Sequence, residues 1–237
     1  MACSTPRPWL LLLCVWLALT AAAFAHRDDY LDETLVYVTL ERHEIEPEYW
    51  IDFGDSRSAG IFLRHHFALE YGITTRWMVD GRATAIQETG GARFDSARLE
   101  TRYRFREEGK LPVDIAVSGE LNTSRDELGA RRYAFEPRLI LSKDFREKWN
   151  VTLNLAEEIA LTGGEHSFNP AFGVRYNARR KLRLGSELKY DSEAQNGAVI
   201  PQVWFVLPHG TTLKIGFAAG FGPRRRHFGR IALEKEF

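Results

Sequence analysis

Apolar and polar residues alternate at every second position through most of this chain. In the first such segment, Tyr49 and Ile51 fall on one face and Glu48 on the other. A period of two is that of a β-strand, and no segment after the first 25 residues sustains the helical period of 3.6. The pattern predicts twelve strands, near residues 45–53, 61–71, 73–85, 97–106, 111–121, 133–142, 149–161, 171–178, 182–191, 199–207, 211–220 and 227–237.

The first 25 residues differ from the rest and have the pattern of a signal peptide. Arg7 supplies a positive charge, residues 9–19 form an apolar run, and Ala23 and Ala25 match the small residues before a cleavage site. We expect cleavage after Ala25. The alternative is an uncleaved anchor, but the apolar run is short for the ~20 residues that a membrane-spanning helix needs.

Charge and cysteine content exclude several function classes. The 32 basic residues equal the 32 acidic ones, so the chain lacks the basic excess typical of nucleic-acid binders. A mean hydropathy of -0.31 excludes a helical membrane protein. Both cysteines, Cys3 and Cys14, lie in the predicted signal peptide. The mature chain would therefore have no disulfide, zinc–thiolate site or thiol catalysis, which suits an oxidising compartment.

Two architectures can bury alternating strands: a sandwich with its apolar faces inside, or a barrel with its apolar faces in lipid. The alternation persists for about 9 to 11 residues, the length of a tilted strand across a bilayer. Longer and shorter connections also alternate, as in outer-membrane barrels. We therefore predict an all-β fold, an antiparallel transmembrane up-and-down barrel of about twelve strands over residues 44–237.

Residues 26–43 precede this barrel, and we expect them in the periplasm or folded into the lumen. Residues 35–40 could form a thirteenth strand. An odd strand number would spoil closure of the barrel, because open sheet edges leave backbone groups unpaired in hydrocarbon.

The last strand carries a terminal aromatic residue, Phe237, with Leu233 and Ile231 on the same face. This ending resembles the C-terminal assembly signal of Gram-negative outer-membrane β-barrel proteins. The resemblance is to the class and names no family. Lys235 departs from it, since the class usually has an apolar residue there. The resemblance implies location in the outer membrane and contact with the barrel-assembly machinery.

Inward-facing charges indicate what the barrel could do. Basic residues of the second to fourth strands face acidic residues elsewhere, which would give a transverse field across a wet pore. We expect a narrow porin-like passive channel for small polar or charged solutes. The alternative is a lumen closed by salt bridges between neighbouring strands. The candidate lumen residues are Arg64, Arg76, Arg82, Arg98, Glu100, Arg102, Arg104, Asp114, Glu120, Glu136 and Arg138. The inward Trp50 and Trp204 could stack on a sugar or nucleoside.

An outer-membrane hydrolase is the rival interpretation. His166 and Ser167 lie in a predicted outer loop, but adjacent strand residues point to opposite faces, so they cannot act as a catalytic pair. His65 and His66 cannot share a metal for the same reason. We expect no catalysis, metal or cofactor.

Three arginines in the last outer loop, Arg224, Arg225 and Arg226, could face lipopolysaccharide phosphates, because guanidinium groups match phosphate geometry. The expected partners are therefore outer-membrane lipid, lipopolysaccharide and the assembly machinery. The oligomeric state is not fixed by these patterns.

Overall fold

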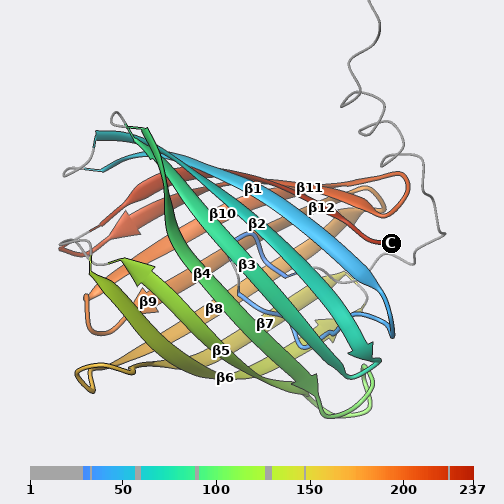
Figure 1. Ribbon diagram of the computed structural model, residues 1–237. Coiled ribbons are helices and arrows are strands. Elements are labelled where there is room, and N and C mark those ends of the chain that lie inside the picture. The colour runs from blue at the N-terminus through green and yellow to red at the C-terminus, as the bar shows by residue number, and fades with distance from the viewer. Residues whose placement is uncertain are drawn as a thin grey trace, which may run out of the picture.

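Twelve antiparallel strands close into a barrel in the computed structural model, which describes residues 29–32, 34–56, 60–88, 91–125, 130–146, 148–223 and 225–237 (Figure 1). Each strand pairs with the next in the chain, and the last pairs with the first. The strands are β1 (Ile45–Ser56), β2 (Gly60–Thr74), β3 (Trp77–Glu88), β4 (Gly91–Arg104), β5 (Asp114–Arg125), β6 (Arg131–Phe145), β7 (Trp149–Ala160), β8 (His166–Arg179), β9 (Leu182–Asp191), β10 (Asn196–Leu207), β11 (Thr211–Phe221) and β12 (His227–Lys235).

The closing seam lies between β1 and β12. Trp50 is the cross-strand partner of Ala232, and Tyr49 that of Leu233. Ile45 extends the seam beyond β12, since its backbone N–H donates to the Phe237 carbonyl at 3.4 Å and its carbonyl accepts from the Phe237 N–H at 3.1 Å. Closure pairs the edges of the described strands, so the predicted up-and-down barrel is confirmed.

The even strand number places the start of β1 and the end of β12 at one end of the barrel, which we call the terminal end. The opposite end is the loop end. Most connections at the terminal end are tight, as predicted, but residues 105–113 form a long one. Gly109 has a φ of 69° there, and its N–H donates to Asp114 Oδ1. Pro112 cannot donate to a strand ladder, so β5 begins at Asp114.

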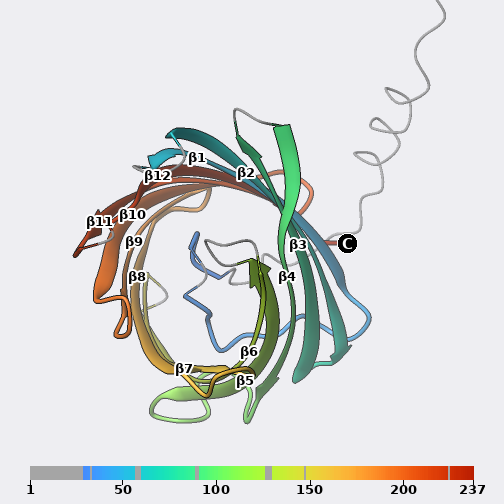
Figure 2. The ribbon, with the colours of Figure 1, turned by 60° about the vertical axis from the view of Figure 1, so that its left-hand side comes forward.

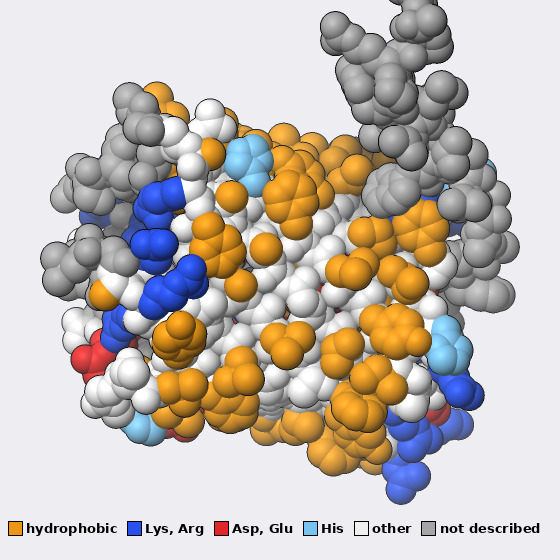
Figure 3. Space-filling model, in the orientation of Figure 1, with side chains coloured by type: hydrophobic (Ala, Val, Ile, Leu, Met, Phe, Trp, Pro, Cys, Tyr) orange, Lys and Arg blue, Asp and Glu red, His pale blue; other side chains and the backbone are white. Residues whose placement is uncertain are grey.

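The outer surface of the barrel is apolar between its two ends. Leu99, Phe67 and Leu69 point outward and are 58, 56 and 55% exposed. Figure 3 shows such side chains over the middle of one face, with lysines and arginines gathered toward the ends. The described residues include no helix long and apolar enough to cross a membrane. A sandwich would have buried these side chains, so the sandwich alternative is wrong.

The interior of the barrel is polar and contains part of the chain. Figure 2 shows the blue N-terminal segment inside the ring of strands. The described residues between Thr34 and Leu40 form no strand, which leaves the barrel with its even strand number. The signal peptide predicted for residues 1–25 lies outside the described residues.

We expect the effect of a charge on the outer surface to depend on its depth. Leu99→Arg, near the middle of β4, should lower the free energy of unfolding by about 2–4 kcal/mol in lipid vesicles. Leu207→Arg, at the terminal end of β10, should cost ~1 kcal/mol or less, because the guanidinium reaches the headgroups there. Urea unfolding followed by tryptophan fluorescence measures both. Equal losses would contradict a lipid-facing belt.

Candidate functional site in the barrel lumen

The described residues among 29–40, here called the plug, cross the barrel interior. Six of its apolar side chains are buried, and Val38 is partly buried; the six are Tyr30, Leu31, Leu35, Val36, Tyr37 and Leu40. An irregular segment has no ladder to satisfy its backbone groups, so partners must come from the wall. The wall supplies them from several strands.

Three wall side chains accept hydrogen bonds from backbone N–H groups of the plug. Glu187 of β9 accepts from the N–H of Asp32 at 2.7 Å and from the N–H and hydroxyl of Thr34 at 3.0 and 2.7 Å. Gln202 accepts from the Leu31 N–H at 2.9 Å. Asn154 accepts from the N–H of residue 35 and donates to its carbonyl, both at 2.8 Å. Side chains thus replace the neighbouring strand that this segment lacks.

The two carboxylates of the plug form ion pairs with the wall. Arg102 donates hydrogen bonds from two guanidinium nitrogens to the Asp29 carboxylate, at 2.7 and 3.1 Å. Arg230 lies 2.9 Å from Asp32 and also donates to the Leu31 carbonyl at 3.0 Å. Lys214 donates to the Asp29 carbonyl at 2.6 Å. Charge-assisted bonds of this kind are stronger than neutral ones, so they hold both ends of residues 29–32.

Shape complements these polar contacts. The Tyr30 ring meets Trp204 edge to face, with centroids 5.8 Å apart. A Cβ at Gly173 would come within 2.7 Å of the Tyr30 ring, so only glycine leaves room for this ring. Trp204 is fully buried, and Arg82 covers the Trp50 ring at 4.1 Å. Neither indole therefore presents an open stacking face to a sugar or nucleoside.

A row of carboxylates follows the wall from β1 to β6. Each member is the direct cross-strand partner of the next, and all are buried. We call the following residues the carboxylate row: Glu46, Glu70, Asp80, Glu100, Glu120 and Glu136. Like charges in such positions repel each other and destabilise a sheet unless counter-charges lie nearby.

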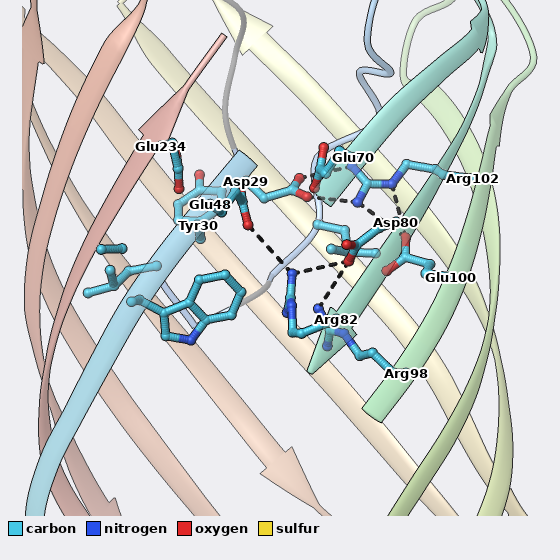
Figure 4. Close-up of a pocket in the computed structure, with 14 residues that line it drawn as sticks. Asp29, Tyr30, Glu48, Glu70, Asp80, Arg82, Arg98, Glu100, Arg102 and Glu234 are labelled. Atoms are coloured by element: carbon cyan, nitrogen blue, oxygen red, sulfur yellow. Dashed lines mark hydrogen bonds and ion pairs between the residues drawn. The ribbon is translucent and has the colours of Figure 1, made fainter. Parts of the chain in front are cut away.

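Arginines beside this row supply counter-charges to four of its members, Asp80, Glu100, Glu120 and Glu136. Asp80 pairs with Arg82 at 3.1 Å and with Arg98 at 3.6 Å, as Figure 4 shows. Arg98 also reaches Glu120 at 3.5 Å. Two further ion pairs have the same acid–x–arginine spacing along one strand: Glu100 with Arg102, and Glu136 with Arg138. The two signs are therefore interleaved, and they do not form opposite walls.

The structure brings most of the predicted lumen residues into this network. Its predicted members are Arg82, Arg98, Glu100, Arg102, Glu120, Glu136 and Arg138. Arg64 instead pairs with Asp95 at 3.3 Å toward the loop end. Arg76 and Arg104 both pair with Glu107 at the terminal end, at 3.2 and 3.1 Å.

Other predicted residues lie at the rims and the seam. Asp114 accepts a hydrogen bond from the long terminal-end connection, and Ile231 and Leu233 point outward on β12. Arg225 and Arg226 are exposed at the loop end, whereas Arg224 lies outside the described residues. Lys235 donates to the His209 carbonyl.

Two cavities open toward the loop end of the lumen. The larger, of about 480 Å³, is lined by Glu136, Arg138, Lys189 and Asp191, with Asp32 of the plug among its lining residues. The second, of about 270 Å³, is lined by residues of β2 to β5, among them His66, and by Glu158 of β7. Both are large enough for small solutes and carry charges of both signs.

The His166 and Ser167 pair is separated as predicted. Ser167 donates to Asp191 at 3.0 Å, whereas exposed His166 pairs with Glu157 at 3.0 Å. No described histidine bonds the Ser167 hydroxyl, so these residues form no nucleophile–base pair.

Several residues of the site were not among those predicted from the sequence. Glu70, Glu187, Lys214 and Arg230 occupy inward positions that the alternation of their strands could have revealed. The acid–x–arginine spacing, repeated on three strands, was a further signal. The contacts of Asp29 were not readable, since partners such as Lys214 lie 185 residues along the chain.

No protein-family model and no curated protein sequence matches this chain. Among solved structures, it is similar to the KdgM porin, with a TM-score of 0.62 and 10% identity over 81% of this chain and 99% of that one. An outer membrane channel from Pseudomonas putida F1 has a TM-score of 0.58 and 12% identity, over 85% of this chain and 98% of that one. The NanC porin has a TM-score of 0.55 and 10% identity, over 80% of this chain and 98% of that one. These likenesses confirm the fold as that of Gram-negative outer-membrane barrels.

We expect a methyl group at residue 173 to loosen the plug. Gly173→Ala should displace the Tyr30 ring and destabilise the bound position of the plug by ~1–3 kcal/mol, the usual cost of overpacking. Because the chain has no cysteine after residue 14, a single Leu35→Cys reporter can measure this. Its labelling by a polar maleimide should accelerate about tenfold in the Gly173→Ala background, as ~1.4 kcal/mol changes an equilibrium tenfold.

Gly81→Ala is the matched control, because a Cβ there meets nothing within 4 Å. It should leave labelling of the cysteine reporter unchanged. The same labelling rate in all three backgrounds would show that Tyr30 does not hold the plug.

Proposed function

We propose that this protein is an outer-membrane barrel that acts as a narrow passive channel for small polar or charged solutes, without a catalytic step. The observation that carries the proposal is the pair of charged cavities at the loop end, enclosed by a barrel with an apolar exterior. The solved structures that it resembles are described as porins and an outer membrane channel, which supports the same activity here.

The plug sets the width of this channel. It borders the larger cavity, and its residue Asp32 is part of the lining of that cavity. Solutes would therefore pass through the space that the plug leaves, or after it shifts. Charges of both signs along the path would orient polar solutes and disfavour apolar ones.

A closed structural barrel is the second candidate. It is supported by the ion pairs between neighbouring strands of the wall and by the number of wall side chains that hold the plug. Twelve strands lie between eight-stranded barrels filled by side chains and open sixteen-stranded porins, so strand number alone does not decide.

Lipopolysaccharide is the partner that we propose for the loop end. Arg225 and Arg226 are exposed there, and arginine suits bidentate contact with phosphate. At the other end, the Phe237 strand would be recognised by the barrel-assembly machinery, as the resemblance of this ending implies.

Conductance in planar bilayers tests the channel. The full chain should give small openings, and Asp29→Asn with Asp32→Asn and Glu187→Gln should raise their size several-fold, because these changes weaken the anchors of the plug. Deletion of residues 29–40 should raise it further. Glu193→Gln, in the β9–β10 loop, is the control for loss of an acidic group. Silence of every variant, with the barrel folded by its heat-modifiable gel migration, would favour the structural barrel.

A further inference from the structure

Two neighbouring turns at the terminal end of the barrel are strongly basic. One is the end of β6 with the turn to β7, residues 143–148, and the other is the turn from β8 to β9, residues 179–181. We call them the basic turns. The Asn177 N–H donates to the Lys148 carbonyl at 2.7 Å, so the two lie side by side. Their six basic residues are Lys143, Arg146, Lys148, Arg179, Arg180 and Lys181, and their two acidic residues are Asp144 and Glu147. This part of the rim therefore has a net charge of plus four.

Most of this positive charge is accessible from outside the barrel. Five of the six basic side chains are exposed, and Lys143 is half-buried. Among the described residues, which do not include Glu147, no carboxylate forms an ion pair with any of the six. Asp144 accepts a hydrogen bond from buried Asn150 at 3.3 Å, so its charge is directed toward the lumen. The basic turns thus present cations that an anionic partner can contact.

A row of outward side chains lies directly beside the basic turns. Its members are Phe145, Trp149, Tyr176 and Leu184, each the cross-strand partner of the next across β6 to β9. The Trp149 and Tyr176 rings pack together with centroids 4.5 Å apart, and Trp149 is exposed. Tryptophan and tyrosine on a membrane-spanning wall prefer the depth of the lipid headgroups. The row therefore places the basic turns beside headgroup phosphates.

The opposite ends of the same two strands carry the opposite charge. At the loop end, β7 and β8 and their connection contribute residues 157–166, which include three glutamates and no lysine or arginine. A rim that needed charge only to stay in water would not differ in sign between the two ends of one hairpin. Outer-membrane barrels have their short turns on the periplasmic side, so the positive end meets the phospholipid leaflet in the proposed orientation.

We propose that the basic turns and the aromatic row beside them bind an anionic phospholipid of the leaflet at the terminal end. Arg179 and Arg180 would donate to the phosphate, and the acyl chains would pack on Trp149 and Tyr176. Each lysine or arginine near an anionic lipid surface contributes about fivefold to binding. The inference rests on the proposed location in a membrane, but it does not depend on conduction through the lumen.

Quenching of Trp149 by brominated lipids tests the site. The full chain with Trp77→Phe is refolded into phosphatidylcholine vesicles that contain a small fraction of dibrominated phosphatidylglycerol or, separately, of dibrominated phosphatidylcholine. Trp149 is then the outward-facing tryptophan of the described residues, because Trp50 and Trp204 are buried. Phosphatidylglycerol should occupy the position beside Trp149 with about tenfold preference over phosphatidylcholine. High salt should lower this preference, because it screens exposed charges.

Two pairs of variants separate charge from structure. Arg179→Gln with Arg180→Gln should reduce the preference to about twofold or less, whereas the same two positions changed to lysine should keep most of it. Arg131→Gln with Arg132→Gln is the matched control, since it removes two adjacent exposed arginines at the loop end. It should leave the preference at Trp149 unchanged. Heat-modifiable migration on gels confirms that each variant is folded.

The second outward tryptophan serves as an internal control. In Trp149→Phe protein, Trp77 of β3 reports on a less basic part of the same rim, where Glu107 pairs with Arg76 and Arg104. The preference for phosphatidylglycerol should be clearly smaller there. Equal preference at Trp77 and Trp149 would show a general attraction to the barrel end and would overturn a site at the basic turns.

Equal quenching of Trp149 by the two brominated lipids would also overturn the proposal, and would leave the basic turns to a soluble anionic partner. Unchanged preference in folded protein with Arg179→Gln and Arg180→Gln would overturn it as well. Absence of quenching by either lipid would instead contradict the lipid-facing wall, and with it the proposed channel. Failure of the lipid site and failure of the proposed function therefore give different results.

Discussion

Most charged side chains that point into this barrel pair with counter-charges within the lumen, because the strand wall separates them from the surroundings. The carboxylate row shows how this requirement organises the wall. Its members would repel one another across neighbouring strands, and arginines two residues along the same strands offset most of that repulsion. The lumen is thus a network of interleaved charges, and its polar surface is what a solute or an ion would meet.

The plug belongs to this network as an additional partner. Asp29 and Asp32 provide carboxylates to Arg102 and Arg230, while Glu187 accepts hydrogen bonds from its backbone. Its removal would therefore expose cationic groups of the wall as well as open space. For this reason the width and the charge selectivity of the lumen are coupled in the proposed channel.

Much of the barrel could be predicted from alternation alone, since a period of two assigns each side chain to one face. Arg82, Glu100 and Arg102 were placed inside on that basis, and the structure buries all three. Arg76 illustrates the limit, because it belongs to a turn where the period no longer applies, and it pairs with Glu107 outside the central network. Glu70 was missed as a candidate although it shares the inward face of β2, opposite Glu46.

The sequence by itself determined the strand pattern, the apolar exterior and the polar interior, since these follow from local periodicity and the free energy of transfer from water. Only the tertiary structure decided the register, which aligns Glu46 with Glu70 and Glu48 with Glu234. It also decided the path of the plug through the lumen. Both depend on contacts between residues far apart in the chain, and the ring of strands brings such residues together only when it closes.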